Sequence, residues 1–232
     1  MKMATLVLTV LFALVGVHSA QGQNYESERG FRLILHGESK TPMKIGLPYL
    51  ATAAVIKYRF LSGKSPSVQD WLSKSSCENL QPIKDAETLK MFKEEFVVAA
   101  AEWSKVANIT FVYVDLDEHA DVLVGFQGEP TGTAFVNLKV RQNEEGIHTI
   151  TKGIVCLNPR KRWVNTPGIP ETYSSAYVFA HELGHILGFD HPWGQRSQGS
   201  LMLTAYPEAR NSLTPFLSKS DAEGAQYLYG QR

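Results

Sequence analysis

The sequence of 232 residues is poor in cysteine and has no excess charge of either sign. It contains only two cysteines, Cys77 and Cys156, which excludes a structural zinc site built from several cysteine thiolates. Its 23 basic and 23 acidic residues balance to a formal net charge of zero, and no basic run stands out. We therefore expect no nucleic-acid partner and no anionic membrane partner, because both bind through clustered positive charge.

Long apolar runs are also missing, except near the amino terminus. There Lys2 precedes an apolar run from Ala4 to Val17 that is too short to cross a bilayer comfortably. The small residues Ser19 and Ala20 follow it. This pattern is typical of a cleaved signal peptide, so we expect residues 1–20 to be removed and the mature protein to be secreted into the extracellular space.

In a secreted protein, the cysteines and the glycosylation sequon of the mature chain can be interpreted. Two cysteines in a secreted protein most simply form one disulfide, which predicts a Cys77–Cys156 bond. Asn108-Ile109-Thr110 is an acceptable glycosylation sequon in a eukaryotic source. The mature length suits one domain, and we divide it into an N-terminal extension or short pro-segment over residues 21–47 and a catalytic domain over residues 48–232.

The most informative segment is HELGHILGFDH at residues 181–191, which follows the pattern H-E-x-x-H-x-x-G-x-x-H. Residues four apart share a helix face, so His181 and His185 can bind one ion. Glu182 lies beside the first ligand and can reach a water on the metal as a general base. Gly188 can end the helix in the left-handed conformation, after which the chain can return His191 to the same ion.

Three neutral nitrogen ligands and a water describe a catalytic zinc ion. The alternative is that these histidines merely decorate an amphipathic helix. Given this composition, the full pattern is expected by chance on the order of 10⁻⁵ to 10⁻⁴ times per chain. The helix also carries an apolar stripe roughly opposite the histidines, which fits a helix with one buried face and one face in a cleft. The members of the stripe are Phe179, Leu183, Ile186 and Leu187.

At these residues the chain resembles the metzincin zinc endopeptidases, and within them the matrixins. SLMLTAY, residues 200–206, is similar to the methionine turn of the clan, with Met202 as a hydrophobic floor beneath the zinc histidines. SDAEGAQYLYG, residues 220–230, is similar to the closing helix of a matrixin catalytic domain. FVVAAAEWSKVANITFVYV and ADVLVGF are similar to its first helix and next two strands. The resemblance spans about residues 54 to 230.

The resemblance implies an α+β metzincin catalytic domain, in which a mixed twisted sheet packs on two long helices and an irregular C-terminal subdomain ends in a helix. It implies a zinc metalloendopeptidase that cleaves peptide bonds of extracellular proteins by zinc-activated water, with Glu182 as the base. We expect a monomer that acts on protein or peptide substrates without a membrane partner. A secreted zinc-binding protein of the same fold that has lost catalysis is the alternative, although retention of Glu182 argues against it.

Local patterns predict the main elements. Asp85 can cap a helix that runs to about Val106, and a second helix is expected over about Ser174–Leu187. Ser220 with Glu223 has the spacing of a capping box for the last helix. The expected strands are Ala54–Phe60, Ile109–Val114, Asp121–Phe126, Gly132–Val136 and Gly153–Leu157. The strand around Gly132–Val136 can pair with an extended substrate through an exposed sheet edge.

Several departures from the matrixin pattern bear on function. Pro192 follows the third histidine where matrixins usually carry serine or threonine. No cysteine precedes the first predicted strand, so the pro-segment cysteine with which matrixins often block their zinc is missing. The mature enzyme is then either active on secretion or blocked by another group such as His36 or Glu38. Only His148 is a plausible second metal residue between Gly125 and Thr151, so one catalytic zinc is expected. A calcium ion can be considered at the acidic group Asp115, Asp117, Glu118 and Asp121.

Overall fold

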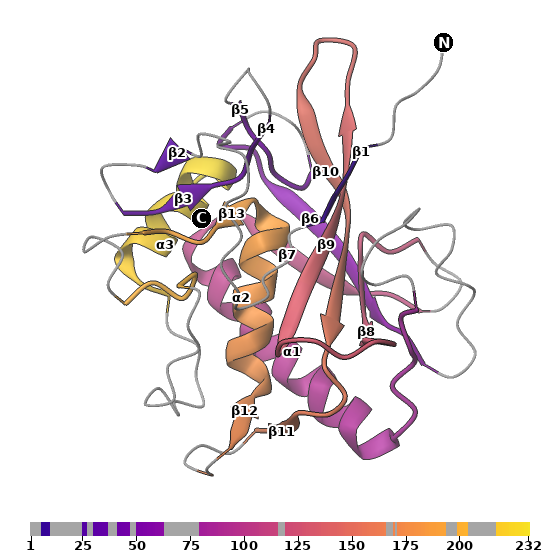
Figure 1. Ribbon diagram of the computed structural model, residues 1–232. Helices are drawn as coiled ribbons and strands as arrows, with labels where there is room; N and C mark the ends of the chain where they lie inside the picture. Colours follow the sequence, from indigo (N-terminus) through magenta and orange to yellow (C-terminus); the bar gives the residue numbers. More distant parts are fainter. Residues whose placement is uncertain are drawn as a thin grey trace.

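A computed structural model describes residues 6–9, 25–26, 30–36, 41–46, 50–62, 79–115, 119–165, 169, 171–193, 199–203 and 217–232 (Figure 1). None of the helices in these ranges is long and apolar enough to cross a membrane. In chain order the elements are β1 (Leu6–Thr9), β2 (Tyr25–Glu26), β3 (Arg32–Leu33), β4 (Leu35–His36), β5 (Thr41–Pro42), β6 (Ala54–Phe60), α1 (Ala86–Val106), β7 (Ile109–Tyr113), β8 (Val122–Phe126), β9 (Ala134–Gln142), β10 (His148–Leu157), β11 (Arg162–Val164), β12 (Thr172–Ser174), α2 (Ser175–Leu187), β13 (Phe189–Asp190) and α3 (Lys219–Tyr229).

The main sheet is mixed, as expected for this α+β fold. Its strand order is β1-β9-β10-β8-β6-β7. The four strands β7, β6, β8 and β10 are parallel to one another, whereas β9 is antiparallel to β10 and β1 is antiparallel to β9. β1 lies within the predicted signal peptide, so the remaining strands form a five-stranded sheet with β9 at one edge and β7 at the other.

Helices α1 and α2 cover one face of this sheet and share one hydrophobic core with it (Figure 1). Asp85 caps α1 by accepting a 2.7 Å hydrogen bond from the Thr88 backbone N–H, as its sequence position predicted. The buried stripe of α1 is the predicted one: Phe92, Phe96, Ala99, Ala100 and Trp103. Trp103 joins the two helices, because its indole N–H donates a 2.9 Å bond to the Ala180 carbonyl.

β9 and β10 are longer than the sequence predicted. β9 continues beyond its expected last residue, and β10 begins before its expected first residue. The two added lengths form a hairpin that projects beyond the rest of the sheet (Figure 1). Asn143 supports the turn of this hairpin, because its side-chain oxygen accepts bonds from the backbone N–H groups of Glu145 (3.1 Å) and Ile147 (2.8 Å). The added length comes from pairing between the two strands, which local composition does not reveal.

Cys156 lies on β10 and is fully buried on the sheet face opposite the two helices. It packs there with five apolar residues: Leu61, Leu80, Leu123, Phe135 and Ile154. Cys77 lies outside the described residues, so the Cys77–Cys156 pairing stays a prediction.

The predicted capping box of the last helix is wrong. The structure forms the box from Ser218 and Asp221 rather than from Ser220 and Glu223, and α3 begins at Lys219. The Ser218 hydroxyl accepts a 3.1 Å bond from the Asp221 N–H, and the Asp221 carboxylate accepts a 2.9 Å bond from the Ser218 N–H. The reason is tertiary: Asp221 is buried, with 1% of its surface exposed, because it also binds a loop beneath α2.

The described part of the N-terminal segment packs into the core. Phe31, Leu33, Met43 and Ile45 are buried there. β3 pairs with β13 directly after α2, and the Ile34 N–H donates a 2.8 Å bond to the carbonyl of Gly188. Residues 30–36 and 41–46 therefore lie against the loop that leaves the motif helix. The division of the chain at residues 47 and 48 stays a prediction.

Candidate metal centre

Helix α2 begins and ends where the sequence predicted. The Ser174 side chain accepts a 3.4 Å bond from the Tyr177 N–H at its start. At its end Gly188 is left-handed, with φ 107° and ψ 12°. Glycine is required here for two reasons: the backbone conformation disfavours other residues, and a Cβ would collide with the Met43 carbonyl oxygen. β13 then turns the chain back towards the helix.

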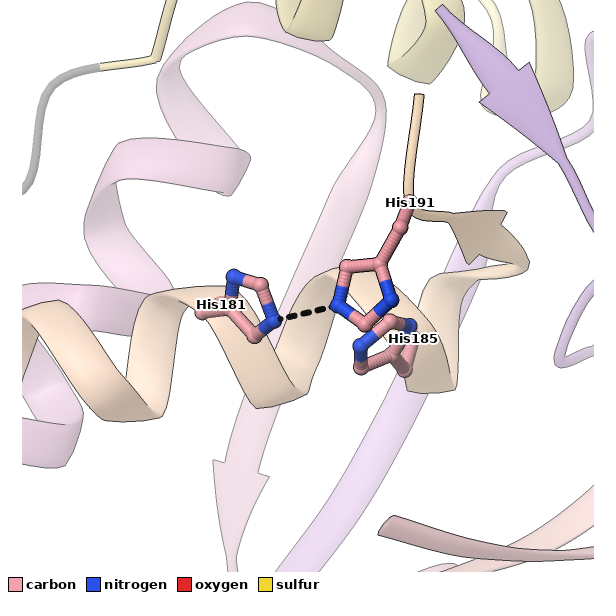
Figure 2. Close-up of side chains that lie close together, drawn as sticks. All are labelled: His181, His185 and His191. Carbon is pink, nitrogen blue, oxygen red and sulfur yellow. Dashed lines mark hydrogen bonds between the residues drawn. The ribbon is translucent and has the colours of Figure 1, made fainter. Parts of the chain in front are cut away.

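This return brings the three motif histidines together (Figure 2). His181 and His185 project from one face of α2, and His191 faces them from the segment after β13. One nitrogen from each ring lies within 4.8 Å of the others, and the Nε2 atoms of His181 and His191 are 3.0 Å apart. His185 and His191 are buried, whereas His181 is partly exposed. The cluster is thus close enough to share one ion and open on one side.

Hydrogen bonds fix the tautomers of the two helical histidines. The Nδ1 atom of His181 lies 2.8 Å from the Leu201 carbonyl oxygen, and that of His185 lies 2.9 Å from the Phe189 carbonyl oxygen. A carbonyl only accepts hydrogen bonds, so each Nδ1 carries the proton and each Nε2 offers a lone pair. This is the usual support of a metal-binding imidazole.

Burial also keeps the rings neutral. It lowers the pKa of His181 to about 3 and that of His185 to about 4, with the neighbouring His185 adding to the effect on His181. The pKa of His191 is lowered as well, first by burial and then by the other two histidines. Neutral imidazoles with converging ring nitrogens fit a zinc ion, which prefers nitrogen donors of this kind.

Glu182 lies on the same helix and is buried, with 5% of its surface exposed. Within the described part of the chain, no hydrogen-bond partner meets its Oε2 atom. Burial raises the pKa of Glu182 to about 8. An unsatisfied buried carboxyl group is costly to folding, and such groups concentrate at functional sites. Glu182 is therefore a buried carboxyl group beside the histidines with one oxygen left without a partner.

The loop beneath the histidines contains Met202, as the sequence predicted. Met202 is buried, and its sulfur fills the space beside Gly184 so closely that a Cβ at Gly184 would collide with it. Asp221 of α3 holds this loop. Its carboxylate accepts bonds from the Ser200 hydroxyl (2.6 Å) and the Leu201 N–H (2.8 Å). The Leu201 carbonyl in turn orients His181, so α3 is linked to the metal centre through this loop.

Sequence reasoning did not identify Asp221 as part of the site. The signal for Asp221 is its Ser-x-x-Asp spacing from Ser218, which competes with the equal spacing of Ser220 and Glu223. Sequence reasoning also did not identify Arg32 and Asp190, whose side chains form an ion pair of 3.3 Å beside His191. Arg32 had no signal, because its contact with Asp190 joins residues far apart in the chain.

Of the other candidate metal residues, those that the structure describes do not join the cluster. In the described ranges, the three histidines are the one group of three or more potential ligands that converges. Asp121 accepts a 2.8 Å bond from the Lys57 N–H, and Asp117 and Glu118 lie outside the described residues. His148 begins β10 and is buried. Glu38 and the segment 204–206 lie outside the described residues, as does the side chain of His36.

We expect Met202→Leu to cost less than about 1.5 kcal/mol of unfolding free energy and to leave zinc stoichiometry unchanged. Leucine has a similar volume, and three histidines already complete the protein ligands of a catalytic site. Chemical denaturation and metal analysis of the purified variant test this. Loss of zinc from a folded Met202→Leu protein would contradict the role of Met202 as a floor.

A mixed sheet backed by two helices, with this histidine cluster at the end of the second helix, defines a metzincin-like catalytic domain. The Matrixin peptidase family model matches residues 75–230, and the chain belongs to this family. The chain is also similar to the protein named Metalloendoproteinase 1-MMP from Arabidopsis thaliana, with 26% identity over 201 residues. That match covers 84% of this chain and 52% of the plant protein, so the chain spans about half the length of this relative.

Proposed function

We propose that the protein is a secreted zinc-dependent endopeptidase that hydrolyses peptide bonds of extracellular proteins. His181, His185 and His191 hold the zinc ion, and Glu182 is the general base. The observation that carries this proposal is the unpartnered Oε2 atom of the buried Glu182 beside three imidazoles whose ring nitrogens converge. Membership of the matrixin family supports the same chemistry.

In the proposed hydrolysis, the zinc ion and the protein side chains have different roles. His181, His185 and His191 would hold a zinc ion, which would lower the pKa of a bound water and polarise the scissile carbonyl. Glu182 accepts the proton of the water as it attacks and delivers that proton to the leaving nitrogen. The carbonyls of Leu201 and Phe189 keep His181 and His185 in the metal-binding tautomer throughout. No other acid is needed, because one carboxyl group both takes and returns the proton.

The outer edge of β9 is the proposed place for an extended substrate. In the structure β1 pairs there, with Leu6 opposite Val140 and Thr9 opposite Asn137. This edge therefore accepts an extended antiparallel segment through main-chain hydrogen bonds, which is how a strand-adding peptide binds. Removal of residues 1–20 as a signal peptide would free the edge for substrate. The neighbouring residues 134–136 extend the same edge in the N-terminal direction.

The proposal is tested by assaying the purified secreted protein on fluorescent gelatin and casein. We expect cleavage that stops when a zinc chelator is added and returns when stoichiometric zinc is restored. Because the chelator acts on the ion alone, near-ultraviolet circular dichroism should show the fold retained. A protein that binds one zinc ion through its histidines but cleaves neither these substrates nor a peptide library would instead be the inactive zinc-binding protein considered above.

A further inference from the structure

Arg32 is a buried arginine beside the third histidine of the cluster. Only 8% of its side chain is exposed. Its Nη1 atom donates a 3.1 Å hydrogen bond to the His191 carbonyl, and its Nε atom lies 3.3 Å from the Asp190 Oδ2 atom. The guanidinium carbon lies 4.1 Å from the ring centroid of Trp193. One side chain thus contacts three residues of the segment 190–193.

Asp190 completes this arrangement on the other side of His191. Its Oδ1 atom accepts a 2.8 Å bond from the His191 N–H, while its Oδ2 atom faces Arg32. The Arg32–Asp190 pair therefore holds both backbone polar groups of His191. Pro192 adds a further restriction, because a residue before proline is disfavoured from the helical region and is held extended.

His191 has more need of such support than the other two histidines. His181 and His185 are fixed by the hydrogen bonds of α2, which is capped at both ends. His191 instead follows a strand of two residues, β13, whose ladder partner in the sheet is β3. Arg32 belongs to β3, so the same residue contributes to the ladder and to the side-chain clamp. The His191 ring therefore depends on contacts with the N-terminal segment, whereas His181 and His185 are held by helix α2.

We propose that Arg32 is a positioning residue that holds His191 in register with His181 and His185 for metal binding. The inference rests on the proposed function, because it assumes that the three histidines hold the zinc ion. It also makes residues 30–36 and 41–46 part of the folded peptidase domain. Any processing of the N-terminal segment that leaves an active enzyme must then end before Phe31.

Lysine cannot fully replace arginine in this position. The guanidinium group makes one bond to a carbonyl and one ion pair to a carboxylate while its flat face stacks on an indole ring. A lysine ammonium is a point charge that keeps the attraction to Asp190 but not the planar fork. Arg32→Lys should therefore retain part of the effect, and Arg32→Ala should lose it.

The experiment compares the full-length secreted protein with its Arg32→Ala and Arg32→Lys variants. Arg59→Lys is the matched control, because Arg59 is also buried, with 5% exposure, but lies on β6 away from the histidines. Zinc affinity is measured by competition with a chromophoric chelator. The absorption spectrum of the cobalt-substituted proteins reports ligand geometry, and thermal melting of the metal-free proteins reports folding.

We expect Arg32→Ala to weaken zinc binding by about 10- to 100-fold, as is typical when a group that orients a ligand is removed. Arg32→Lys should fall between Arg32→Ala and the wild type. Arg59→Lys should bind zinc within about two-fold of the wild type, whatever its melting temperature. The cobalt spectrum of the Arg32 variants should change, because His191 no longer keeps its orientation.

Zinc binding within two-fold of the wild type in both Arg32 variants would overturn the positioning role. An equal loss in Arg59→Lys would also overturn it, because the loss would then follow from general destabilisation. If Arg32→Ala does not fold, Arg32→Lys decides the matter on the same criteria. A wild-type protein that binds no zinc would refute the proposed function itself, which is a different result from any of these.

Discussion

Replacing Glu182 with alanine is expected to lower peptidase activity by several orders of magnitude while zinc and the fold are kept. Loss of a general base alone costs typically 10² to 10⁴ in rate, and the alignment of the attacking water is lost with it. Zinc should remain, because the expected ligands are three histidines and not this carboxylate. Glu182→Gln, which keeps the side-chain volume, should behave in the same way.

The stability of the metal-free protein gives an independent check on Glu182. Its folded-state pKa is raised to about 8 from an ordinary value of 4.5, so the folded state holds the proton more tightly than the unfolded state. Burying the charged form therefore costs stability that grows as pH rises from about 4.5 to 8 and is constant above that. Metal-free Glu182→Gln should be more stable than the wild type above pH 8.

The activity of Glu182→Ala and Glu182→Gln is measured as kcat/KM on a fluorogenic peptide, and zinc content is measured on the same samples. Glu87→Ala is a suitable control, because Glu87 is an exposed residue in the first turn of α1. It should keep wild-type activity. Cleavage by Glu182→Ala at near the wild-type rate would remove Glu182 from the reaction and reopen assignments outside this peptidase clan.

Replacing His185 with alanine should remove most of the bound zinc. His185 lies close to both other rings, with ring centroids 4.9 Å from His181 and 4.6 Å from His191. Without it two nitrogen ligands remain, and a catalytic zinc normally requires three protein ligands. Metal analysis after dialysis measures the effect.

His148→Ala is the control for this variant, because His148 is likewise buried but begins β10 apart from the cluster. It should keep one zinc ion per chain. If His185→Ala retained full zinc occupancy, His185 would not be a ligand, and the three-histidine assignment would need another donor.

Local patterns in the sequence were sufficient for the parts of the fold that local interactions decide. α1 starts at the predicted cap, Asp85, and α2 starts at the predicted position, where Ser174 is the cap, because capping involves residues three apart. The helix stop at Gly188 was predictable, because it follows from backbone conformation at one residue. The meeting of His181 and His185 was predictable from helix periodicity.

Only the tertiary structure decided the features that join distant segments. The lengths of β9 and β10 depend on cross-strand pairing, and the start of α3 depends on Asp221 being drawn into the loop at Ser200. The clamp on His191 comes from Arg32, 159 positions earlier in the chain. The sequence by itself thus indicated which side chains form the candidate site, because their spacing is local. What holds the third of them in place was decided by long-range packing, which has no periodic signature in a single sequence.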